Sequence, residues 1–302
     1  MPRPPTFARF ASDFMANYAP VRYKITTVAQ IESMLRIHLL PFLGERSLPD
    51  IGPFELQCYL ADRKKVGLSP RTLRNHVVML RQLFSVALLW GLIDADPTNG
   101  LQSPRQPRGD IPFLTPSQLR ELVAATPADF RLITALAAFC GLRRGEVLSL
   151  RFDHVNTVER TLLIEHSKRG DAIHEPKSRA SIATIPYPAF LAPMIEHRRS
   201  LVGDKSGLIL CRKDGSPLAD SFANRLLKSS LLRAGLPYVT YHQLRGSWVY
   251  GHMQAGTPVH VIQRLGRWES VETLLKSYGR WLPTAGGDAA DALGALIGQI
   301  QE

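Results

Sequence analysis

The chain has 302 residues, which fits about two domains, and its 45% hydrophobic and 21% charged residues predict packed cores rather than disorder. A net charge of +11 points to a polyanionic partner, either nucleic acid or an anionic membrane surface. No apolar run approaches the ~20 residues that cross a bilayer, which excludes a bilayer-spanning protein. The first residues lack the apolar core of a signal peptide, so nothing in them suggests secretion.

The first 100 residues predict helices and no strands. One helix presents an aromatic face that is made by Phe7, Phe10, Phe14 and Tyr18. A capping box at residues 27–30 predicts the start of a second helix, which Pro41 and Gly44 end. Pro53 and Pro70 suit the first turns of a third and a fourth helix. We therefore expect an all-α four-helix domain over residues 1–100.

Basic side chains on this half and on the following segment offer contacts to phosphates, although a solvated helix face explains each of them nearly as well. The candidates are Arg63, Lys64, Lys65, Arg71, Arg74, Arg81, Arg105 and Arg108. The last two belong to residues 101–112, which are rich in proline and charge and predict a linker.

The second half predicts a mixed α and β domain over residues 113–285. A capping box at 115–118 starts a helix, another helix is expected over 127–140, and residues 161–166 and 181–186 read as strands, with 207–211 as a further short one. Helical patterns return after residue 220. The fold class is thus mostly α with a small antiparallel sheet. The tail, residues 286–302, carries a short apolar stripe that suits docking on a neighbouring protomer or packing on its own domain.

Several kinds of functional site have no support in the sequence. There is no glycine-rich loop that ends in Gly-Lys-Ser/Thr, and the histidines and three scattered cysteines show neither metal-binding nor disulfide spacing. We therefore expect no cofactor, no metal and a reducing cytoplasm. What remains is a set of arginines: Arg143 opens a helix, and His242 and Arg245 share one helical face. Two arginines can clamp the oxygens of one phosphate.

The order of these motifs resembles the tyrosine recombinases, the phage integrase family. The resemblance runs from 141-GLRRGE-146 through 176-PKSRASIATIPYP-188 and 241-YHQLR-245 to 257-TPVHVIQRLGRWESVETLLKSYGRW-281. It extends over nearly the whole chain, because residues 26–44 and 68–97 are similar to the family's core-site-binding domain. The family's fold would place a four-helix domain before an α+β catalytic domain.

The resemblance implies a role for each site residue. Tyr278 would attack the scissile phosphate and form a 3′-phosphotyrosyl link, while His242 takes its proton. Arg143 and Arg245 would hold the phosphate, and Lys177, at the family's hairpin position, would protonate the leaving 5′-oxygen. The acidic position, Glu146, would support Arg143 rather than react. Tyr241 and Tyr250 are rival nucleophiles that more plausibly pack.

One position departs from the family pattern. After Leu265-Gly266 the family usually has His, sometimes Trp, but this chain has Arg267 followed by Trp268. Either Arg267 supplies the phosphate donor, which we favour, or a one-residue insertion lets the Trp268 indole supply it. A weakened enzyme is the third interpretation.

The resemblance implies a site-specific recombinase of phage or mobile DNA in the bacterial cytoplasm. It would act on double-stranded DNA as a homotetramer that joins two sites, and it could be a monomer or dimer when no DNA is bound. We expect no membrane partner. Accessory proteins that set the direction of recombination or bend the DNA are compatible with this interpretation. Because the helices begin almost at once, we expect short inverted half-sites and no separate arm-binding domain. The alternatives are a catalytically impaired sequence-specific DNA-binding protein on the same scaffold, a type IB topoisomerase, or an enzyme of another anionic substrate.

Overall fold

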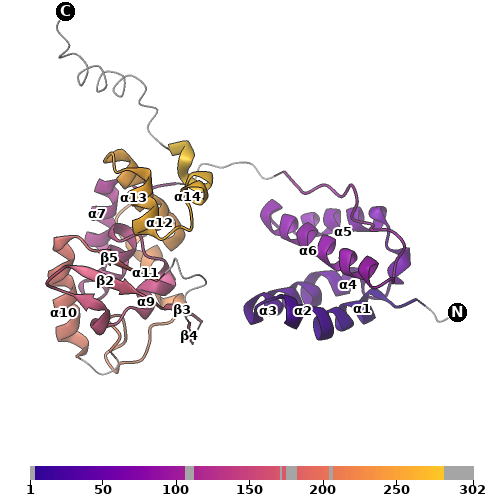
Figure 1. Cartoon of the computed structure of the whole chain (residues 1–302), viewed down its shortest axis with the longest axis horizontal. Coiled ribbons are helices and arrows are strands. Elements are labelled where there is room, and N and C mark those ends of the chain that lie inside the picture. Colours follow the sequence, from indigo (N-terminus) through magenta and orange to yellow (C-terminus); the bar gives the residue numbers. More distant parts are fainter. Residues whose placement is uncertain (1–3, 106–111, 171, 175–181, 204–206, 282–302) are drawn as a thin grey trace, which may run out of the picture. The chain divides into compact units, whose positions relative to one another are not determined.

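The computed structural model describes residues 4–105, 112–170, 172–174, 182–203 and 207–281 (Figure 1). The chain divides into two compact units, Met1–Gly109 and Asp110–Glu302. The division falls inside the segment 101–112 that the sequence predicts as a linker. Lys177, Arg108 and the apolar stripe of the tail lie outside the described residues.

The first unit is built from four helical segments, as predicted. The first two are each interrupted by a π-helical turn: α1 (Phe7–Asp13), the turn Phe14–Tyr18 and α2 (Ala19–Arg22), then α3 (Ile25–Met34), the turn Leu35–Leu39 and α4 (Leu40–Leu43). A 3-10 turn (Leu48–Asp50) leads into α5 (Pro53–Lys65) and α6 (Pro70–Leu89). The aromatic face of α1 is buried in the core of this unit.

Two details of the second segment differ from the prediction. The helix begins at Ile25 rather than at the expected capping box, with Lys24 as an N-cap that makes no side-chain hydrogen bond. Pro41 lies inside the segment instead of ending it, because the π-helical turn before it shifts the backbone bonding from i−4 to i−5 (Leu40 N–H to the Leu35 carbonyl). Gly44 then forms the C-cap as predicted.

The second unit combines helices with short antiparallel strands. Its first part runs through α7 (Pro116–Ala125), a 3-10 turn (Ala128–Phe130), α8 (Arg131–Phe139), α9 (Arg144–Ser149) and a 3-10 turn (Phe152–His154). The strands are β1 (Val155–Asn156), β2 (Thr161–Ile164), β3 (Ser167–Arg169), β4 (Ala172–His174) and β5 (Ala183–Pro186). A 3-10 turn (Ala189–Leu191), α10 (Ala192–Val202), α11 (Asp220–Arg233), α12 (Tyr241–Gln254), α13 (Val259–Gly266), α14 (Val271–Tyr278) and a 3-10 turn (Gly279–Trp281) complete it.

The strands form two small sheets. One has the antiparallel order β1-β2-β5, with Leu162 opposite Ile185, and the other is the β3-β4 hairpin. Residues 207–211, predicted as a strand, make only isolated bridges at Leu208 and Cys211. The fold class, mostly α with a small antiparallel sheet, is confirmed. Across the described part of the chain, no helix combines the length and the apolar character needed to span a membrane.

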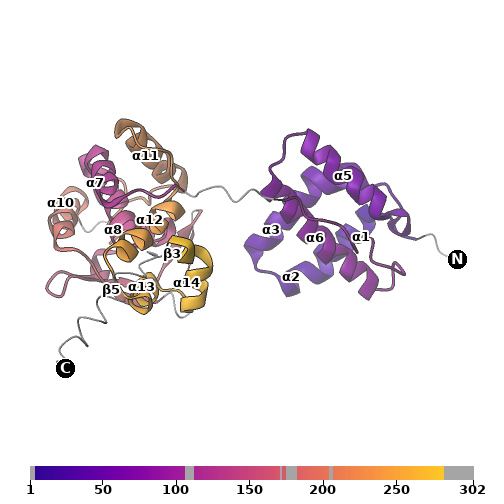
Figure 2. The same cartoon turned by 90° about the horizontal axis from the view of Figure 1, so that it is seen from above.

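Two arrangements in the second unit position the site. Helices α12, α13 and α14 lie side by side in both views (Figures 1 and 2). Helix α9 lies against β3, and Gly145 permits that approach, since a Cβ there would lie 2.4 Å from the Lys168 carbonyl oxygen. The first turn of α9 and the β3-β4 hairpin are therefore held together by backbone contact.

Candidate active site

A strongly basic pocket of about 390 Å³ opens where α9, β3 and the start of α12 meet. None of the described residues that line it carries a carboxylate. The charged or titratable ones among them, with two tyrosines set aside, are Arg143, Arg144, Lys168, Arg169, His242 and Arg245. Such a pocket is complementary to an anion that carries several oxygen acceptors.

Arg245 is the most deeply buried cation among the described residues that line this pocket, with an exposed fraction of 1%. Its guanidinium donates to the carbonyl oxygens of Gly141 (2.6 Å) and Gly266, and its Cζ lies 4.0 Å from the ring centroid of Trp268. Burial, followed by the nearby charges of Arg143 and Arg267, lowers the pKa of Arg245 to about 9. An anion in the pocket would offset this unfavourable environment and favour the charged guanidinium.

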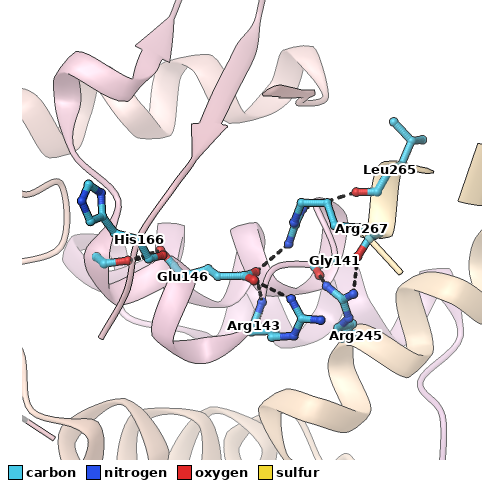
Figure 3. A network of polar contacts seen from close by, with 9 residues as sticks. Gly141, Arg143, Glu146, His166, Arg245, Leu265 and Arg267 are labelled. Carbon is cyan, nitrogen blue, oxygen red and sulfur yellow. Dashed lines mark hydrogen bonds and ion pairs between the residues drawn. The ribbon is translucent and has the colours of Figure 1, made fainter. Parts of the chain in front are cut away.

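Glu146 joins two arginines into one network (Figure 3). Its carboxylate accepts from the backbone N–H of Arg143 (2.8 Å) and from Arg143 Nη1 (2.7 Å). On its other side, Arg267 Nη2 donates to Glu146 Oε2 at 2.6 Å. Burial alone would raise the pKa of Glu146, but Arg267 and Arg143 outweigh it and the pKa is lowered. The carboxylate is therefore held ionised, and it fixes the N-cap of α9 and the Arg143 side chain.

The structure does not place the Arg267 guanidinium where we expected it, free to meet a phosphate. Its side chain is 0% exposed and is directed toward Glu146, with a second hydrogen bond to the Leu265 carbonyl oxygen. The backbone explains the direction, because Arg267 is the C-cap of α13 in the left-handed conformation, with φ of 59°. Sequence spacing cannot show that a residue after Leu-Gly turns inward.

Tyr278 ends α14 and is 6% exposed. Its ring packs against Phe113 and meets Trp268 edge-on, with centroids 5.8 Å apart. Gly246, next to Arg245 on α12, gives this ring room, since a Cβ there would lie 3.2 Å from Tyr278 Cε1. Burial raises the pKa of the Tyr278 hydroxyl, although Arg245 and Arg143 act in the opposite direction.

The two rival tyrosines and His242 differ in their burial and in their contacts. Tyr241 is buried and donates its hydroxyl to the Ala223 carbonyl oxygen at 3.2 Å, so it packs in the core. Tyr250 is partly exposed and stacks on Phe113. His242 is exposed and lines the basic pocket beside Arg143 and Arg245. The structure thus brings His242, Arg143 and Arg245 to one pocket, with Glu146 bound to Arg143 and with Tyr278 packed edge-on against Trp268.

The family comparison matches most of the second unit. The sequence model of the phage integrase family covers residues 112–282, more than half of the chain. The chain belongs to the phage integrase family. It is 22% identical to the integrase of Salmonella phage P22 over 241 residues, 75% of this chain but only 58% of that protein. It is also 22% identical over 280 residues to a XerC-like tyrosine recombinase of Caldanaerobacter subterraneus, covering 82% and 72% of the two chains.

Solved structures share the fold of this phage integrase family member. An integrase of the transposon Tn1549 in complex with a circular intermediate DNA matches with a TM-score of 0.80 and 16% identity, over 97% of this chain and 99% of that one. A lambda integrase tetramer bound to a Holliday junction matches with a TM-score of 0.71 and 18% identity, over 88% and 78%. At these identities the likeness establishes the fold.

A lysine that was not predicted from the sequence lies in the pocket of this phage integrase family member. Lys168 is on β3, is 3% exposed, donates to the Gly170 carbonyl oxygen and has its Nζ 3.9 Å from Asp220 Oδ1. Lys177, the expected hairpin lysine, lies outside the described residues. The sequence feature that could have indicated Lys168 is the run 167-SKRG-170, in which basic residues precede a glycine that suits a tight turn. In the structure Gly170 has a φ of 59°.

The candidate DNA-binding residues of the first unit differ from one another in their exposure and in their polar partners. Arg63 pairs with Asp62, and Arg81 donates to the Leu101 carbonyl oxygen at 2.7 Å. The exposed members of the set are Lys64, Lys65, Arg71, Arg74, Arg81 and Arg105. Exposed cations on one helical unit remain our candidates for contacts with a nucleic-acid backbone.

Proposed function

We propose that this integrase is a site-specific DNA recombinase that cleaves and rejoins DNA through a 3′-phosphotyrosyl intermediate, in the integration or excision of phage or mobile DNA. The observation that carries the proposal is the basic pocket in which Arg143, Arg245 and His242 meet without a lining carboxylate among the described residues. Arginine side chains bind phosphate oxygens through paired hydrogen bonds and stabilise the charge that develops during phosphoryl transfer.

The proposed reaction balances within the protein and the DNA. The Tyr278 hydroxyl oxygen forms a bond to the scissile phosphorus, its proton passes to His242, and the bond between phosphorus and the 5′-oxygen breaks. A lysine ammonium donates a proton to that leaving oxygen. We assign this role to Lys168, because it lines the same pocket as the two arginines; Lys177 is the alternative. The phosphotyrosyl ester conserves the bond energy, so rejoining requires only the reverse attack by a 5′-hydroxyl.

We assign Arg267 to positioning rather than to phosphate contact. Its guanidinium reaches Glu146, which in turn binds Arg143, so its influence on the phosphate passes through that carboxylate. The Trp268 ring contacts both Arg245 and Tyr278: the Arg245 guanidinium lies over its face, 4.0 Å from the centroid, and the Tyr278 ring meets it edge-on. Of the two candidates for the family's His/Trp position, Trp268 therefore has the contacts that suit a neighbour of the phosphate.

The proposed substrate is double-stranded DNA, with two sites joined by a tetramer of this chain. The lambda integrase tetramer on a Holliday junction has the same fold and supports this assembly. The net charge of +11 predicts that affinity falls steeply with salt, because lysine and arginine contacts release counterions from the phosphates.

DNA binding without cleavage is the second candidate function. It is favoured by the burial of Tyr278, which is 6% exposed and whose pKa is raised by that burial. Attack by Tyr278 therefore requires that α14 shift when DNA binds. A protein in which that shift does not occur would bind its site and leave it uncut.

Covalent trapping on a nicked suicide site separates the two functions. The wild type should remain attached to the 3′ end of the cut strand, and Tyr278→Phe should bind the site with unchanged affinity and leave no adduct. The matched control is Tyr250→Phe, which removes a hydroxyl from a partly exposed tyrosine that stacks on the same Phe113. An adduct in Tyr278→Phe would refute the nucleophile, and a bound but uncut site with the wild type would favour the second function.

A further inference from the structure

The β1-β2 hairpin brings together three side chains that have no part in the proposed recombination chemistry. His154 ends the 3-10 turn before β1, and Glu165 and His166 follow β2 directly. One donor atom of each lies within 4.8 Å of the other two. His154 Nε2 is 2.9 Å and His166 Nδ1 is 3.5 Å from Glu165 Oε1.

This spacing matches what a tetrahedral metal ion requires. Bonds of about 2.0–2.1 Å from Zn²⁺ to imidazole nitrogen or carboxylate oxygen place neighbouring donors roughly 3.3–3.5 Å apart. The separations of 2.9 and 3.5 Å to Glu165 lie close to this range, and the two histidine donor nitrogens lie within 4.8 Å of each other. Side-chain rotation would bring the three donors around one ion. Two imidazoles and one carboxylate form a donor set that holds Zn²⁺ and leaves a fourth position for water.

A second observation also points to a ligand. His166 Nδ1 is shielded from solvent and has no hydrogen-bond partner among the described residues. A buried polar atom without a partner is unfavourable, and a bound ligand would remove that cost. The imidazole rings of His154 and His166 are parallel within 5°, with centroids 5.7 Å apart. The distances to Glu165 Oε1 place one nitrogen of each ring beside the same carboxylate.

The surroundings fix the cluster in place. His154 is about nine-tenths buried, which restricts its ring. The Ser149 hydroxyl donates to the His166 carbonyl oxygen at 2.9 Å and ties this segment to the end of α9. These contacts restrict the His154 ring and the backbone that carries His166. From the sequence we expected no metal site, because the histidines show no metal-binding motif spacing. His154 lies eleven positions before Glu165, and the pairing of β1 with β2 brings it to the adjacent Glu165 and His166.

We propose that His154, Glu165 and His166 form a binding site for a divalent transition-metal ion of the Zn²⁺ class. The ion would crosslink the two ends of the β1-β2 hairpin, two residues before Lys168. Its role is structural: it stiffens the segment that joins α9 to β3, while the phosphoryl transfer proposed above proceeds without it. This inference is therefore independent of the proposed function.

Calorimetric titration of the tag-free, chelator-treated full chain with Zn²⁺ tests the site. We expect one saturable site, a thermal unfolding temperature that rises with Zn²⁺, and an intense absorption band when Co²⁺ replaces Zn²⁺. His166→Ala should weaken the affinity at least about tenfold, and Glu165→Gln, which keeps the shape of the side chain, guards against misfolding of the first variant. The matched control is His197→Ala, because His197 Nε2 lies 3.8 Å from Asp129 Oδ1 as a simple pair.

The outcomes are distinct. Loss of affinity in His166→Ala and Glu165→Gln with retention in His197→Ala supports the site. Absence of saturable binding by the wild type, or equal affinity in all variants, overturns it. Trapping of the covalent DNA complex with and without chelator reports separately on recombination, and we expect the same yield in both.

Discussion

Replacing Arg267 with Met removes one cation from a carboxylate that the fold keeps buried. The Arg267 side chain is 0% exposed, Glu146 is 4% exposed, and their atoms are 2.6 Å apart. Breaking a buried ion pair by deleting one partner costs about 3–5 kcal/mol. Because Glu146 keeps Arg143, whose side chain is 42% exposed, we expect the lower end, about 3 kcal/mol.

Urea unfolding followed by tryptophan fluorescence measures this loss, since Trp248, Trp268 and Trp281 belong to the second unit. The control is Arg264→Met, which removes an exposed arginine from the same helix and should change the free energy of unfolding by less than about 0.5 kcal/mol. The pKa of Glu146 is lowered in the folded state, so its contribution to stability is present above the unfolded value of about 4.3 and is lost as pH falls through the folded value. The difference between wild type and Arg267→Met should therefore shrink in acid.

Single-turnover cleavage of a suicide site at saturating protein then tests the route of the effect. If Arg267 acts through Glu146, the double variant Arg267→Met with Glu146→Gln should cleave no more slowly than the slower single variant. Neither single variant should exceed the loss of about 10²–10³ that deletion of one transition-state donor causes. Multiplying effects in the double variant, or an unfolding free energy unchanged by Arg267→Met, would refute the positioning role.

Three further predictions concern the same unit. Gly246→Ala should destabilise the second unit by about 1–3 kcal/mol and reduce the covalent complex, because the added Cβ would lie 2.5 Å from Phe113 Cε1. The control Gly251→Ala should stabilise α12, because the nearest atom to its Cβ is 3.9 Å away. Equal unfolding midpoints of the two variants would contradict the close approach at Gly246. Lys168→Met should slow cleavage of a normal 5′-oxygen and be rescued by a 5′-bridging sulfur, which leaves without a proton; absence of rescue would return the role to Lys177. Trp268→Ala should slow cleavage at constant DNA affinity, since Trp268 covers Arg245 at 4.0 Å, and full-rate cleavage by this variant would exclude Trp268 from the site.

The sequence by itself determined the helical first half, the mixed second half and the family. Helix periodicity and capping residues are local properties, so the helix that Thr115 caps was predicted directly, and the structure shows its capping box. The order of short motifs identified the family because each motif carries its own residues, such as 141-GLRRGE-146. Local patterns failed where the backbone departs from an α-helix, as in the π-helical turn before Pro41.

Only the tertiary structure decided where the site residues point. Arg267 turns inward because the left-handed C-cap of α13 directs it to Glu146, 121 residues earlier in the chain. Lys168 enters the pocket because Gly145 lets α9 lie against β3. His154 and His166 meet because β1 pairs with β2. These placements depend on contacts between segments distant in sequence, and residue spacing within one segment carries no information about such contacts.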